Sequence, residues 1–86
     1  MKYLVCLSPR SPETSCNSIE FELKSYGPMN RVAPLCWVLF SRMGIGEITQ
    51  KLNDCFQDTV GSIFVCSFEE WRGRGLDNDL IERLKN

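Results

Sequence analysis

The residues best suited to bind a ligand form one short cluster in the last quarter of the chain. Trp71 is followed at once by Arg72 and, after one glycine, by Arg74. An indole can stack on a nucleobase and guanidinium groups bind phosphates, so this cluster predicts contact with nucleic acid or an acidic partner. Arg31 and Arg42, at the ends of the expected central hairpin, add two further cations. The structural alternative is that the indole packs on an uncovered sheet face, while the arginines are solvated or paired with the two preceding glutamates.

Catalytic and metal-binding chemistry finds little support in the sequence. The chain has no histidine, so the usual general base and the commonest metal ligand are both absent. Gly44 and Gly46 lack the third glycine and the lysine of a phosphate-binding loop. Asp77 and Asp79 open a predicted helix, where carboxylates stabilise the N-terminus without any metal. We therefore assign no catalytic residue, no metal site and no cofactor.

The cysteines are widely spaced and odd in number. The five are Cys6, Cys16, Cys36, Cys55 and Cys66, with no C-x-x-C pair among them. Three lie in apolar strand-like runs, where a free thiol behaves as a small hydrophobe. This usage predicts reduced cysteines and a cytoplasmic protein.

Length and composition indicate one small globular domain. The 86 residues are 43% hydrophobic and 24% charged, with a net charge of −1. A domain that binds duplex phosphates usually carries a basic excess, so any contact with nucleic acid must come from a local patch. The longest uncharged apolar run, residues 32–41, is too short to cross a bilayer, and we expect no membrane association.

Hydrophobic periodicity predicts alternating strands and helices. Strands are expected at residues 3–7, 31–33, 35–41 and 60–68. Apolar residues spaced by three or four predict two helices, one carrying Cys16, Ile19, Leu23 and Tyr26 and one carrying Ile45, Ile48, Leu52 and Cys55. This order predicts an α+β fold of the ferredoxin-like βαββαβ type, with an antiparallel sheet and two helices on one face. We expect this domain to span residues 1–76, followed by a short tail helix over residues 77–86.

The expected strand at residues 35–41 is apolar on both faces. The face expected to meet the helices carries Cys36, Val38 and Phe40. The other face needs cover from a partner or from the tail, and an exposed apolar patch of that size predicts a homodimer interface. The residues assigned to this interface are Leu35, Trp37, Leu39 and Trp71.

Several short motifs carry a resemblance to a known family. They are Lys24-Ser25-Tyr26-Gly27, Pro34-Leu35, Trp37-Val38, Glu47-Ile48, Leu52 and Trp71-Arg72-Gly73. In these motifs the chain resembles the SinR-like small proteins, which belong with the VapD toxins and the small CRISPR-associated adaptation protein of the same fold. The likeness covers about residues 2–76. It implies a ferredoxin-like protomer that dimerises through its sheet, with residues 68–76 extending onto the partner.

The resemblance also implies a class of function. Some relatives are metal-dependent endonucleases with an aspartate at the end of the first strand, where this chain has Ser8, which cannot supply an anionic oxygen to a cation. We therefore expect a non-catalytic dimeric interaction protein of toxin–antitoxin, mobile-element or defence type that binds a protein partner or structured nucleic acid. The alternatives are a structural subunit of a larger assembly and a metal-dependent endoribonuclease whose acidic residues are Asp58, Asp77 or Asp79.

Overall fold

The chain folds around a four-stranded antiparallel sheet. The computed structural model describes residues 1–10 and 16–85. Along the chain the elements are β1 (Lys2–Pro9), α1 (Cys16–Lys24), β2 (Met29–Ala33), β3 (Cys36–Phe40), α2 (Ile45–Phe56), β4 (Val60–Ser67) and α3 (Asn78–Leu84). The predicted α+β class and antiparallel sheet are confirmed.

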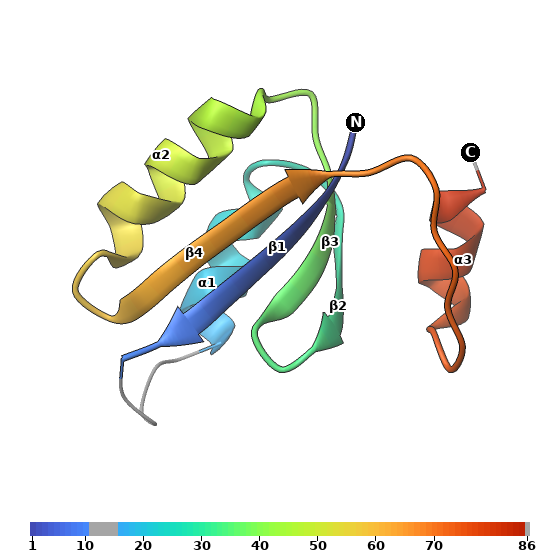
Figure 1. Ribbon diagram of the computed structural model, residues 1–86, viewed down its shortest axis with the longest axis horizontal. Coiled ribbons are helices and arrows are strands. Elements are labelled where there is room, and N and C mark those ends of the chain that lie inside the picture. The colour runs from blue at the N-terminus through green and yellow to red at the C-terminus, as the bar shows by residue number, and fades with distance from the viewer. Residues whose placement is uncertain (11–15, 86) are drawn as a thin grey trace.

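The strands lie in the order β2-β3-β1-β4, so β1 and β3 are central and β2 and β4 are edges. β1 pairs antiparallel with both β3 and β4. The connection through α1 joins β1 to β2 across β3, and the connection through α2 joins β3 to β4 across β1. Figure 1 shows α2 and α3 on opposite sides of the sheet.

The main core lies between the sheet and the helices α1 and α2. Its buried residues are Tyr3, Val5, Leu7, Ile19, Leu23, Tyr26, Trp37, Leu39, Ile48, Leu52 and Val60. Trp37 is the largest side chain that is fully buried, and its indole N–H donates to Glu20 Oε2 on α1 at 2.9 Å. The same carboxylate lies 3.9 Å from Arg31 Nε on β2. One acidic residue thus satisfies the polar atom of the central aromatic and ties α1 to the edge strand.

This arrangement reverses the expected faces of β3. Trp37 and Leu39 lie under the helices and are fully buried within one chain, so the expectation that they face away from the helices is wrong. Leu35 also packs against this core. Alternation divides β3 correctly into two sets of side chains, but the larger set fills the deeper layer between sheet and helices because it buries more apolar area there.

The second face of the sheet is partly covered by α3. Leu80 and Leu84 are buried against Val38, and four partly buried residues complete this cluster: Leu4, Phe40, Phe68 and Leu76. Polar contacts add to the packing, because Arg83 donates to Asn30 Oδ1 at 2.9 Å and the Asn30 amide donates to Asp79 Oδ2 at 3.1 Å. Trp71 belongs to neither cluster and is 38% exposed, so α3 and not this indole covers the sheet within one chain.

Two backbone positions determine where β2 and β3 begin. Pro34 and Leu35 form the tight turn between β2 and β3, and Leu35 takes a left-handed φ of 62°, so the strand begins at Cys36 and not at Leu35 as expected. Gly27 passes directly against β3, where a Cβ atom would collide with the Phe40 carbonyl oxygen. Only glycine allows the chain to enter β2 this close to β3.

The two tryptophans provide a direct test of this core. We expect Trp37→Ala to lower the free energy of unfolding by about 3–5 kcal/mol, because it leaves a cavity and removes the hydrogen bond to Glu20. Trp71→Ala removes a side chain outside both clusters and should cost less than about 1 kcal/mol. Urea denaturation of both variants measures the difference. Equal losses would contradict the assignment of Trp37 to the core.

Candidate functional site

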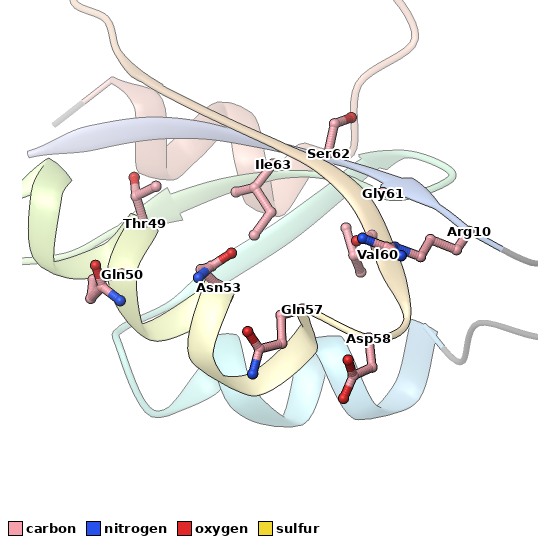
Figure 2. A pocket seen from close by; sticks show the side chains of 10 residues that line it. All are labelled: Arg10, Thr49, Gln50, Asn53, Gln57, Asp58, Val60, Gly61, Ser62 and Ile63. Carbon is pink, nitrogen blue, oxygen red and sulfur yellow. The ribbon is translucent and has the colours of Figure 1, made fainter.

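An open groove of about 620 Å³ runs between α2 and the edge strand β4 (Figure 2). On the sheet side of α2, Ile48 and Leu52 are buried in the core and hold the helix against the strands. The neighbouring polar stripe of the helix then borders β4. Gln50, Asn53 and Gln57 are spaced by three and four residues along the chain, which brings their amides to one side of α2 as lining of the groove.

The amide side chains of the groove are suited to binding and not to proton transfer. Arg10 Nε donates to the Val60 carbonyl at 3.3 Å, and Gln50 Nε2 donates to Asp54 Oδ1 at 2.9 Å. In residues 1–10 and 16–85, the amides of Asn53 and Gln57 have no hydrogen-bond partner. Amides donate and accept without changing charge, so these two can bind peptide groups, hydroxyls or base edges. The spacing of Gln50, Asn53 and Gln57 is visible in the sequence, but these residues were not identified from it as candidates for binding.

The outer edge of β4 has unpaired backbone groups. The Phe68 N–H donates to the Lys2 carbonyl at 3.1 Å, and antiparallel pairs alternate in hydrogen bonding, so the even-numbered residues of β4 bond to β1. The N–H and C=O groups of Ile63, Val65 and Ser67 therefore point away from β1, where the described sheet has no further strand. β4 contains no proline and no charged residue that would discourage pairing at this edge.

Phe64 is the large apolar side chain associated with this edge. It is 59% exposed and lies on the same sheet face as Cys6, its direct neighbour on β1. α3 packs over Val38 and Leu4 on this face, and Phe64 is not part of that cluster. Sequence reasoning missed Phe64, because the exposure of a strand residue depends on which strand lies at the edge.

The predicted arginines lie on separate parts of the fold. Arg72 and Arg74 are exposed in the connection between β4 and α3, and no ion pair within the described residues holds either one. Arg31 is on β2 beside Glu20, and Arg42 is exposed just after β3. Of the two alternatives for Arg72 and Arg74, solvation or pairing with the preceding glutamates, the described residues show solvation, and the segment from Trp71 to Arg74 presents an aromatic ring and two cations to solvent.

The acidic residues considered for a nuclease do not form one site. Asp58 lines the groove, Asp77 is the N-cap residue of α3, and Asp79 accepts the hydrogen bond from Asn30 and pairs with Arg83 at 3.4 Å. Within the described residues, no group of three or more cysteine or acidic side chains is arranged to hold a metal ion. Ser8 is exposed near the end of β1, opposite Ser62.

Three thiols gather on the second face of the sheet. Cys6 and Cys36 are direct partners between β1 and β3, and Cys66 on β4 is diagonal to Cys6; all three are free and half-buried. Burial raises the pKa of the Cys6 thiol to about 11, and the hydrogen bond with Cys36 contributes to the same rise. A small hydrophobic residue in an apolar strand is expected in the core under the helices. These three cysteines lie instead on the opposite face of the sheet.

Comparison of the chain with models of protein families, with curated proteins and with solved structures found no match. The SinR-like and VapD-like resemblance therefore rests on the short motifs quoted above. In the part of the chain that the structure describes, no helix combines the length and the apolar character needed to span a bilayer.

The raised pKa of Cys6 predicts its reactivity. The thiolate is the nucleophile, so alkylation of Cys6 by iodoacetamide should be slow near neutral pH and rise about tenfold per pH unit until the pH nears 11. Because the folded state holds this proton more tightly than the unfolded state, the associated stability is present below the ordinary thiol pKa of 9.0 and is lost as the pH rises toward 11.

Mass spectrometry of the Cys6 peptide after timed alkylation measures this rate. The same peptide in urea serves as the control and should react with the ordinary thiol pKa of 9.0. Coincident pH profiles for folded and unfolded protein would contradict the burial of this thiol.

Proposed function

We propose that this chain is a non-catalytic interaction protein that works as a homodimer, in which two copies pair through β4. The observation that carries the proposal is the unpaired edge of β4 beside the exposed Phe64. An edge strand with free backbone groups and no protecting charge favours addition of another strand. This interface replaces the one expected at Trp37 and Leu39, which the helices of the same chain bury.

The alternation along β4 permits a register that places the two exposed phenylalanines together. The outward backbone groups belong to odd-numbered residues, so an antiparallel pair of β4 strands can hydrogen-bond Ile63 of each copy to Val65 of the other. A twofold axis then passes beside Phe64, and the two Phe64 rings lie directly opposite on one sheet face. A cross-strand aromatic pair contributes about 0.2–1 kcal/mol beyond an alanine pair, and its burial removes a 59% exposed ring from water.

The connectivity supports a finer assignment of the fold. We propose the ferredoxin-like type, because each helical connection in residues 1–10 and 16–67 crosses one intervening strand and both helices lie on one face. The resemblance to SinR-like and VapD-like proteins implies the same type and a toxin–antitoxin, mobile-element or defence setting. A cytoplasmic location belongs to the same proposal.

The proposed dimer presents two copies of the exposed segment that carries Trp71, Arg72 and Arg74. Two guanidinium groups that form no ion pair within residues 1–10 and 16–85, beside an accessible indole, favour an acidic partner, either a structured nucleic acid or an acidic protein surface. Within the described residues, the scattered positions of Asp58, Asp77 and Asp79 give the endoribonuclease alternative no common site. Binding without cleavage is therefore the function that the geometry supports best.

We expect light scattering to give a mass of twice 9.9 kDa at micromolar concentration. Phe64→Asp should yield the monomer, because two carboxylates would face each other across the twofold axis. Ser67→Pro should also weaken the dimer, since it removes an outward N–H without removing a bond to β1.

Two variants serve as matched controls for the dimer. Phe21→Asp introduces the same charge at a phenylalanine that is 79% exposed on α1, and Ser67→Ala keeps the outward N–H. Both should remain dimeric. A wild-type monomer, or a Phe64→Asp protein that is still a dimer, would contradict pairing through β4.

Replacing both Arg72 and Arg74 with alanine tests the partner. If they contact phosphates, the slope of log Kobs against log salt concentration should fall by roughly two units, with the melting temperature nearly unchanged. Fluorescence anisotropy with a hairpin RNA and a DNA duplex measures this. Lys24→Ala combined with Lys51→Ala removes the same charge elsewhere and should leave the slope unchanged; equal effects from both pairs would argue against a specific nucleic-acid contact.

A further inference from the structure

We propose that Cys6 and Cys36 form a dithiol site that reacts with low-molecular-weight disulfides and ends as a disulfide bridge between β1 and β3. The site lies on the second face of the sheet, on two central strands, and does not depend on pairing through β4. It is therefore separate from the function proposed above.

The strand register brings these two cysteines together. The Leu7 N–H donates to the Leu35 carbonyl at 2.9 Å, and at the other end of the pair the Ser41 N–H donates to the Met1 carbonyl at 3.1 Å. Odd-numbered residues of β1 therefore form the hydrogen-bonded pairs with β3, and Cys6 with Cys36 is a non-hydrogen-bonded pair. In such pairs the Cα atoms are about 4.5 Å apart, within the range that a disulfide bridges. Both thiols are free and lie on the same face of the sheet.

The third thiol is less well placed. Cys66 lies opposite Leu4, and Phe64 lies opposite Cys6, so Cys66 is a diagonal neighbour of Cys6. Diagonal neighbours are about 7–8 Å apart, beyond the usual disulfide range. The geometry therefore favours Cys36 as the partner of Cys6 over Cys66.

The site is accessible to a small reagent. Cys6 and Cys36 are both half-buried, not enclosed, and neither belongs to the cluster that α3 forms with Val38 and Leu4. Cys36 directly follows the exposed turn at Pro34, which opens its side of the pair to solvent. A linear disulfide can approach from that side.

The reaction takes place in two exchange steps. The Cys36 thiolate attacks one sulfur of the small disulfide, a mixed disulfide forms, and one small thiolate leaves and takes up a proton. The Cys6 thiol then loses its proton to solvent, attacks the Cys36 sulfur of the mixed disulfide, and displaces the second small thiolate. Two electrons pass from the two cysteines to the reagent, which is reduced to two thiols. We assign the first attack to Cys36 because it lies beside the exposed turn at Pro34, and burial of the Cys6 thiol, which raises its pKa, agrees with this order.

Incubation of the full chain with 2-hydroxyethyl disulfide, followed by alkylation and peptide mapping, tests the proposal. We expect a linked pair of peptides that contain Cys6 and Cys36, with a melting temperature higher by roughly 10 °C, because the bridge closes a long loop. Cys66→Ser should form the same bridge. Cys36→Ser should form no bridge at Cys6.

Several results would overturn the proposal. They are a wild-type chain that carries only mixed disulfides, a bridge between Cys6 and Cys66, or a bridged chain that melts at a lower temperature than the reduced chain. The wild-type mapping decides the question by itself if Cys36→Ser does not fold, and Cys66→Ser then serves as the thiol-depleted control.

Discussion

The pairing of β1 on both of its sides is the constraint on which the rest of the structure depends. Its odd-numbered residues hydrogen-bond to β3 and its even-numbered residues to β4, while successive side chains alternate between the two faces. Tyr3, Val5 and Leu7 consequently enter the main core, and Leu4 and Cys6 face the other side. The core, the need for α3, the thiol pair and the free edge at β4 all follow from this one strand.

Much of the fold could be predicted from the sequence because spacing is a local property. Apolar residues three and four apart located both helices on the sheet, and alternation located the strands. Alternation could not decide which face of β3 meets the helices, because either set of side chains is apolar. The decision depends on Trp37 reaching Glu20, seventeen residues away in the chain, and on the leucines of α3 covering Val38.

The surfaces proposed to bind partners were partly visible in the sequence. The polar, glycine-bearing segment of Arg72 and Arg74 was visible in the sequence, but the choice between solvated arginines and arginines paired with the preceding glutamates required the structure. The roles of Phe64 and the β4 edge were not predictable in the same way, because an edge exists only once the order of strands is known. The Cys6 and Cys36 pair depends likewise on the register between β1 and β3, two strands that no short turn joins.

The position of α3 in the chain also affects how the protein is made. Leu84 comes seventeen residues after Ser67 at the end of β4, so at ~5–20 residues per second a ribosome needs about 1–3 s to synthesise the cover after the last strand. Until α3 has been made and has packed on the sheet, the face that carries Leu4, Val38 and Phe40 lacks its cover by Leu80 and Leu84. Slow translation over residues 68–84 would prolong this exposure and increase contact with chaperones or with neighbouring nascent chains.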